Sequence, residues 1–187
     1  MKPFPSSPPL PLAPKPWNFP EQVTRQVTPG VDVVVVRMPA LPIVNVRWCF
    51  LSAGLLENAN VVGSAALLQR MLRHGTLEQD AMAFARQLDR QGIRLGTQVS
   101  ADSMVVSVTA LREHFADAIQ IANDVAFRPR LPESALAMER IRAQHSLQQA
   151  ANQPESVVGI WLNHAVYGSH PYGRPPSTIS GLRRTTV

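Results

Sequence analysis

Five histidines are the residues of this chain whose ring nitrogens could bind a metal ion or move a proton. A catalytic zinc site needs three protein ligands and one open position, and ligands from one helix recur at i,i+3 or i,i+4 spacing. The histidines show neither spacing and fall on separate predicted elements. By themselves they predict no metal site. They are His74, His114, His145, His164 and His170.

Nucleophilic and phosphate-binding motifs are absent from the sequence. Cys49 lies within a predicted strand and is the only cysteine, so it forms no internal disulfide and is expected to be a buried apolar thiol. Neither a Gly-x-Ser-x-Gly elbow nor a glycine-rich phosphate loop occurs. These patterns give no support to a serine or cysteine hydrolase or to a nucleotide-binding enzyme.

One helical stretch has the layout of a metal site without its donors. Residues 63–76 form an apolar, alanine-rich run that breaks at Gly75. In zinc peptidases of the inverted His-x-x-Glu-His type, two histidines face the zinc and the glutamate is the general base. Here these positions hold Ala66, Gln69 and Arg70. At about 3.6 residues per turn they share one helix face, but a methyl group and a guanidinium cannot ligate zinc.

Further segments follow in a fixed order. Residues 33–54 read as two leading strands ending in a glycine, and His74-Gly75-Thr76 closes the helix. Residues 138–147 read as a later helix, and residues 167–175 as the loop after another one. In this order and spacing the chain resembles the pitrilysin/insulinase family of zinc metallopeptidases, especially its processing-peptidase-like branch. The resemblance covers most of the chain.

The resemblance implies a vestigial site. It places the third zinc ligand at Ser146 and retains the supporting acid, seven residues earlier, as Glu139. Glu139 and Ser146 share a helix face that is expected to look onto the face of Ala66, Gln69 and Arg70. Without a metal, a partly buried Glu139 needs another cation, and Arg70 is expected within salt-bridge reach. The alternative is that Arg70 turns to solvent.

Hydrophobic periodicity predicts an α+β domain with a mainly antiparallel sheet and helices packed on one face, which the resemblance describes as LuxS/metalloenzyme-like and processing-peptidase-like. Residues 1–20 are proline-rich and predict an extended arm; residues 21–187 predict a single domain. Strands are expected at 23–27, 31–38, 43–51, 93–101 and 103–111, helices at 61–74, 77–91, 112–126, 132–149 and 154–167, and a loop-rich tail from 168.

Composition narrows the remaining classes. The net charge is +5, but the arginines are scattered over different predicted elements, so nucleic-acid binding is an alternative rather than the first interpretation. The sequence contains no eighteen-residue apolar span, so no membrane helix is expected. Prolines interrupt every hydrophobic run near the N-terminus, which argues against a secretory signal. A cytoplasmic location is expected, or a periplasmic one if the N-terminus is processed.

The function expected from these observations is that of a catalytically inactive pitrilysin/insulinase homologue with no cofactor. The resemblance implies that non-catalytic copies in that family pair with zinc-bearing partners, complete a closed chamber and help to hold peptides. Complete subunits have two such domains in tandem, so this chain looks like the first, and the second domain is a candidate partner. Two alternatives stay open: an active metallopeptidase with an unconventional zinc site, and a basic nucleic-acid-binding module.

Overall fold

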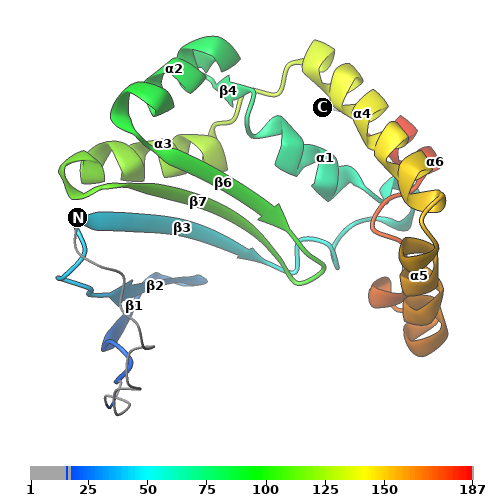
Figure 1. Ribbon diagram of the computed structural model, residues 1–187, viewed down its shortest axis with the longest axis horizontal. Coiled ribbons are helices and arrows are strands. Elements are labelled where there is room, and N and C mark those ends of the chain that lie inside the picture. The colour runs from blue at the N-terminus through cyan, green and yellow to red at the C-terminus, as the bar shows by residue number, and fades with distance from the viewer. Residues whose placement is uncertain (1–15, 17, 187) are drawn as a thin grey trace, which may run out of the picture. The chain divides into compact units, whose positions relative to one another are not determined.

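The computed structural model describes residue 16 and residues 18–186 (Figure 1). The chain groups into two compact units, residues 1–41 and residues 42–187. The predicted proline-rich arm falls almost entirely outside the described residues. The single domain predicted for residues 21–187 stays a prediction.

The described part of the first unit is a β-hairpin. Strand β1 (Gln22–Thr28) pairs antiparallel with β2 (Val31–Val36), and Gly30 takes a positive φ of 82° in the turn between them. This confirms the two predicted strands and their Pro29-Gly30 turn, although β2 ends two residues earlier than expected. Neither strand contributes a buried residue.

The second unit contains a three-stranded antiparallel sheet in the order β3-β7-β6, formed by β3 (Ile43–Leu51), β6 (Arg94–Val99) and β7 (Ser103–Leu111). Alternation along the central strand buries Met104, Val106, Val108 and Ala110. Helices cover this buried face, which confirms the α+β class (Figure 1). Within the described residues, strands β1 and β2 pair only with each other.

The helices are α1 (Ser64–Met71), α2 (Ala81–Gln91), α3 (Phe115–Phe127), α4 (Glu133–Ala151), α5 (Pro154–Tyr167) and α6 (Ile179–Arg184). Short 3-10 turns η1 (Ala59–Val61), η2 (Arg112–His114) and η3 (Pro171–Gly173) lie between them, together with the two-residue strands β4 (Gly75–Thr76) and β5 (Gln79–Asp80). Two apolar clusters result. The larger joins the sheet to α3 and to Phe84 of α2, and the smaller joins α1 to α4 and α6.

Three sequence predictions need correction. Helix α2 begins at Ala81 instead of Leu77, because the side chain of Asp80 accepts a hydrogen bond from Ala83 N at 2.8 Å and caps the helix. The tail is less irregular than expected, since it contains α6 with the fully buried Leu182. Cys49 is exposed instead of buried, because it points to the outer face of β3.

None of the helices in the described ranges is both long and apolar enough to cross a membrane.

Candidate functional site

A glutamate fixes the start of α1. Glu57 Oε1 accepts hydrogen bonds from Gly63 N at 3.0 Å, Ser64 Oγ at 2.8 Å and Ala65 N at 2.9 Å. A carboxylate at this position both satisfies unpaired amides and complements the positive helix N-terminus. Gly63 has a φ of 107°, and a Cβ there would lie 2.6 Å from Ser177 Cβ. The returning tail therefore requires glycine directly before the helix.

Helix α1 lies between the sheet and α4 (Figure 1). Leu67 and Met71 are buried in the smaller apolar cluster with Leu136 and Ala143 of α4 and with Leu182. This packing turns Ala66 and Gln69 toward β6 and leaves Arg70 beside α4. The three positions predicted to share one helix face therefore contact two different elements, β6 and α4.

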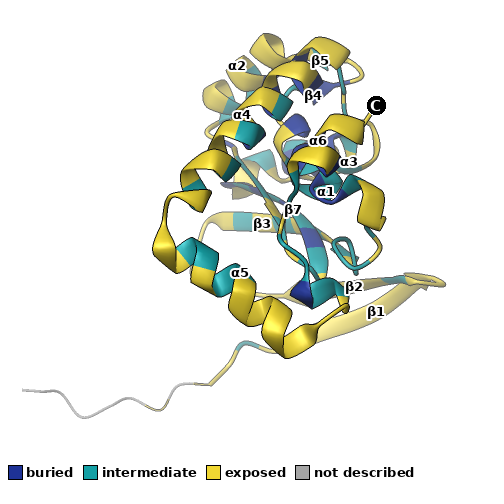
Figure 2. Cartoon of the chain, turned by 90° about the vertical axis from the view of Figure 1, so that its right-hand side faces the viewer, coloured by how far each residue is buried: buried dark blue, intermediate teal, exposed yellow. Residues whose placement is uncertain are grey.

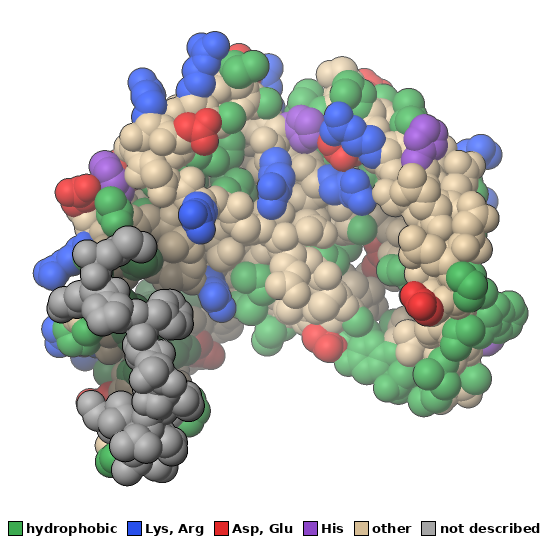
Figure 3. Space-filling view, viewed as in Figure 1, with side chains coloured by type: hydrophobic (Ala, Val, Ile, Leu, Met, Phe, Trp, Pro, Cys, Tyr) green, Lys and Arg blue, Asp and Glu red, His purple; other side chains and the backbone are tan. Residues whose placement is uncertain are grey.

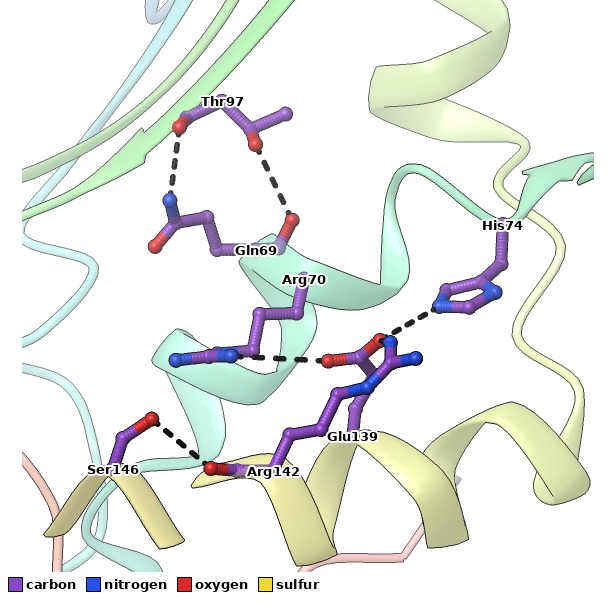
Figure 4. Close-up of polar contacts among 7 residues, drawn as sticks. All are labelled: Gln69, Arg70, His74, Thr97, Glu139, Arg142 and Ser146. Atoms are coloured by element: carbon purple, nitrogen blue, oxygen red, sulfur yellow. Dashed lines mark hydrogen bonds and ion pairs between the residues drawn. The ribbon is translucent and has the colours of Figure 1, made fainter. Parts of the chain in front are cut away.

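Gln69, at the position of the general base, ties α1 to β6 (Figure 4). Its Nε2 donates to Thr97 O at 2.9 Å, and Thr97 Oγ1 donates to Gln69 O at 3.3 Å. Ser100 N donates to Ser103 O at 2.8 Å in the β6–β7 turn, and hydrogen-bonded pairs alternate along an antiparallel ladder. Counting back from Ser100, Thr97 belongs to a non-hydrogen-bonded pair, so its carbonyl points away from β7. Gln69 donates to that carbonyl.

Three basic side chains converge on the carboxylate of Glu139 in α4, whose side chain is only 7% exposed (Figure 4). Arg142 Nη1 donates to Oε1 at 2.6 Å, and His74 Nε2 lies 3.2 Å from the same oxygen. Arg70 Nη1 lies 3.8 Å from Oε2. A buried carboxylate without partners would be strongly unfavourable, and here its neighbours supply the compensation. We call these four residues the Glu139 cluster.

The expected approach of Arg70 to Glu139 is confirmed by this distance. The solvent alternative is also partly realised, because the Arg70 side chain is 42% exposed. In the described part of the chain its guanidinium makes the ion pair with Glu139 and no hydrogen bond. Gln69 and Ser146 make their hydrogen bonds to Thr97 and Arg142 instead of to Arg70.

Ser146 stands apart from the cluster. It is exposed, and its Oγ donates to Arg142 O at 3.0 Å, one turn back on its own helix. Such bonds from serine to the preceding turn are common in helices. The structure thus brings Arg70 to Glu139, places Ala66 and Gln69 toward β6, and leaves Ser146 at the surface.

Sequence reasoning missed two members of the cluster. Arg142 follows Glu139 by three residues on a helix, a spacing that predicts an ion pair and could have been recognised. His74 had been assigned to the C-terminal end of its helix, yet it contacts a residue 65 positions away. No local sequence pattern predicts the contact between His74 and Glu139, since it depends on the packing of α1 against α4.

The vestigial positions do not fit the zinc ion that the resemblance implies. Ala66 has no donor atom, Arg70 is a cation paired with Glu139, and Ser146 uses its hydroxyl on its own helix. Among the described residues no group of three or more histidine, cysteine, aspartate or glutamate side chains could hold a metal ion. No catalytic step through zinc follows from these residues.

A cavity of about 590 Å³ adjoins the vestigial positions. Ala66 and Gln69 line one side, and Tyr167 and Tyr172 from α5 and η3 line another. The Tyr172 hydroxyl donates to Asp102 in the β6–β7 turn, and this hydrogen bond, together with burial, raises the pKa of Tyr172. The loop of residues 167–175, singled out in the sequence, therefore lines this cavity.

Comparison with known proteins gives concordant results. The model of the insulinase family, peptidase family M16, matches residues 33–178. The non-peptidase homolog YmxG of Helicobacter pylori is 23% identical over 75% of this chain and 33% of its own length. An uncharacterised zinc protease of Mycobacterium leprae is 26% identical over 88% of this chain and 38% of its own length. The mitochondrial-processing peptidase subunit beta of Neurospora crassa is 26% identical over 70% of this chain and 28% of its own length.

Solved structures share the fold. The peptidase M16 inactive domain from Pseudomonas fluorescens superposes with a TM-score of 0.83 at 23% identity, over 89% of this chain and 41% of that chain. A protease from Helicobacter pylori superposes with a TM-score of 0.81 at 17% identity, over 91% of this chain and 42% of that chain. The chain spans about a third of the length of the curated relatives it matches.

Proposed function

Because this chain belongs to the insulinase family, peptidase family M16, we propose that it is a catalytically silent member of it. In this proposal the chain is a non-catalytic subunit, or half, of a peptidase chamber: it holds peptides, binds no zinc itself and supports a zinc-bearing partner. The partner is another family member or the second domain of the same parent protein.

The observation that carries the proposal is the side-chain chemistry at the vestigial positions. One ligand position lacks a donor atom, one is an arginine held by Glu139, and the third is a serine bonded to its own helix. The general-base position is a neutral amide whose Nε2 is used by Thr97 O. Losing all these functions together removes both metal binding and proton transfer.

Two relatives lend support through their names. The H. pylori relative is called a non-peptidase homolog, and the P. fluorescens structure is called an inactive domain. Other relatives are called zinc proteases, so the family contains members of both descriptions. The side chains at positions 66, 69, 70 and 146 favour the silent description for this chain.

Peptide holding is supported by β6 and the cavity beside it. Strand β6 is an edge strand of the described sheet, and an extended peptide can add to such an edge through main-chain hydrogen bonds. Gln69 already binds the outward carbonyl of Thr97, so Leu95 and Val99 are the outward-facing neighbours left for a peptide. Val99 also lines the 590 Å³ cavity, which could accept a peptide side chain.

Partner binding is supported by α5, which contains no buried residue (Figure 2). Its apolar side chains Val158, Trp161, Leu162 and Val166 are 59–67% exposed. A helix that leaves this much apolar surface in water is typical of an element that packs against another domain or chain.

Metal analysis of the purified chain, with a peptide-cleavage assay, tests the silent role. We expect no stoichiometric zinc and no cleavage. The matched control combines Ala66→His, Gln69→Glu, Arg70→His and Ser146→Glu, which restores every ligand and the base and should bind zinc. One zinc per wild-type chain, lost in His145→Ala, would contradict the proposal.

Co-purification tests the partner role. The chain is expressed with the product of a neighbouring gene, or joined to the second domain of its parent, and its sedimentation is followed. We expect a stable complex that Trp161→Glu weakens. A chain that sediments as a monomer in the presence of every candidate partner would refute the partner role. It would not affect the proposal that the chain lacks catalysis.

A further inference from the structure

The Glu139 cluster carries more positive than negative charge. With His74 neutral, Arg70 and Arg142 contribute +2 against −1 from Glu139, and protonation of His74 adds one more. The arginines are 42% and 57% exposed, whereas Glu139 is 7% exposed. The acid therefore lies beneath its partners, and the uncompensated positive charge faces solvent, where Figure 3 shows basic side chains around an acidic one over α1 and α4.

Hydrogen-bonding capacity in the cluster is unevenly used. Arg142 and His74 both contact Oε1 of Glu139, at 2.6 and 3.2 Å. Arg70 approaches Oε2 only to 3.8 Å, beyond hydrogen-bonding distance, and the fork of its guanidinium donors is unused within the described chain. A planar guanidinium with unused donors matches the two oxygens of a carboxylate.

Arg70 also lies next to the proposed peptide site. Ala66 lines the 590 Å³ cavity, and Arg70 follows it by one helical turn, so both project from adjoining parts of α1. A peptide that occupies the cavity and continues along α1 toward α4 reaches the exposed arginine. The charged residues that line the cavity itself, Asp102 and Arg174, lie far from Arg70 along the chain.

We propose that Arg70 and Arg142 form a carboxylate-binding site, which takes an acidic side chain of a bound peptide. The proposal rests on the proposed peptide-holding function and specifies the peptide class. Glu139 positions both arginines and competes with the incoming carboxylate for them. A nucleic-acid backbone is a poorer match, because its successive phosphates call for a row of basic residues and the cluster offers two arginines.

Calorimetric titration with two matched peptides tests the site. Both peptides are acetylated and amidated hexapeptides, and they differ only in a central glutamate or glutamine. We expect the glutamate peptide to bind about tenfold more tightly, the scale of one charge-assisted contact, and Arg70→Met or Arg142→Met to remove the difference. Arg73→Met, at an exposed arginine three residues beyond Arg70, is the matched control and should leave the difference intact.

Glu139→Gln provides a test with the opposite sign. Removing the competing carboxylate should increase affinity for the glutamate peptide, whereas a purely structural Arg70–Glu139 pair predicts no increase. Thermal melting checks that this variant is folded; if it is not, the two arginine variants decide the outcome. Inorganic phosphate serves as a second probe for the source of the anion.

Each other outcome has a distinct meaning. Equal binding of both peptides overturns the carboxylate site and leaves peptide holding in place. Binding of neither peptide overturns both. Phosphate binding that depends on Arg70, without a preference for the glutamate peptide, shows an anion site that does not serve peptides and overturns the proposal. A preference that survives in Arg70→Met and Arg142→Met places the recognition elsewhere.

Discussion

Glu139 is the buried charge at the contact between α1 and α4, and its partners differ in what they contribute. Arg142 supplies the shortest contact from its own helix, and His74 and Arg70 reach it from the α1 side. The acid is enclosed, whereas Arg70 is partly in water. Removing the buried carboxylate should therefore change the free energy of unfolding more than removing one partly exposed cation.

We expect Glu139→Gln to lower the free energy of unfolding by about 2 kcal/mol, because it removes the one anion that Arg70, Arg142 and His74 share and with it a charge-assisted hydrogen bond. Arg70→Met should cost only about 0–1 kcal/mol, since the pair is half exposed and Glu139 keeps its other partners. Urea unfolding of both variants measures the difference. Equal costs would mean that the partly exposed Arg70 is a true internal strut.

Tyr172 carries the second residue-scale prediction. Its hydrogen bond to Asp102, and then burial, raise its pKa above the ordinary value of 10.0. A pKa raised in the folded state means that the stabilisation is present below the unfolded pKa and is lost as pH rises through the folded pKa. As the pH rises above about 10, the stability of the wild-type chain should therefore fall.

The Tyr172→Phe variant should lack this component of the alkaline loss, and its stability should differ from wild type most clearly below pH 10. Urea unfolding between pH 8 and 11 gives the profile. Tyr167→Phe is the control, because it removes the other tyrosine hydroxyl and keeps the bond to Asp102. Identical alkaline profiles for Tyr172→Phe and wild type would show that the hydrogen bond contributes nothing.

At the scale of elements, the segment after α1 depends on a glycine. Gly75 has a φ of 105°, and a Cβ there would lie 2.3 Å from Gln79 O in β5. Its own carbonyl accepts a hydrogen bond from Arg130 N at 3.1 Å, so it cannot shift without disturbing the entry to α4. His74, directly before Gly75, contacts Glu139.

Gly75→Ala should consequently cost about 3 kcal/mol, near the upper end for a strained backbone position, and should weaken the His74–Glu139 contact. Gly92→Ala is the matched control. Gly92 also has a positive φ, of 61°, but a Cβ there would meet nothing within 4 Å, so only the left-handed conformation counts, at about 1 kcal/mol. Thermal melting should rank the two variants in this order, and the reverse order would contradict the steric argument.

Element boundaries show which local signals were sufficient. Strand β3 and helix α5 follow the predicted ranges, because alternation over Ile43–Leu51 and the flanking Pro154 and Gly168 are complete signals in themselves. Helix α6 was missed. Six residues give too short a period to recognise, and Leu182 is recognisable as a core residue only after the tail returns to α1.

At the scale of the whole molecule, both apolar clusters lie within residues 42–187. The β1–β2 hairpin contributes no buried residue. We therefore expect deletion of residues 1–41 to leave a cooperatively folding chain with Tm changed by less than about 4 °C, the shift that about 1 kcal/mol produces in a chain of this size. Calorimetry checks this, and loss of a cooperative transition would show that the hairpin is needed for the second unit to fold.

The amino-acid sequence alone predicts the fold class, most of the element order and the absence of zinc-donor atoms at positions 66 and 70. These follow from hydrophobic periodicity and from the donor atoms of Ala66, Gln69 and Arg70, which are properties of residues close together in the chain. The approach of Arg70 to Glu139 also followed, because a buried acid requires a cation.

Which cations lie around Glu139, and which residues stay apart from it, depends on how the elements pack in three dimensions. His74 reaches Glu139 across 65 positions because α1 packs on α4, and Gln69 meets Thr97 across 28 because α1 also packs on β6. Ser146 stays outside because its helix turns it to solvent. Such contacts depend on how two elements pack against each other, which the pattern within either element does not specify.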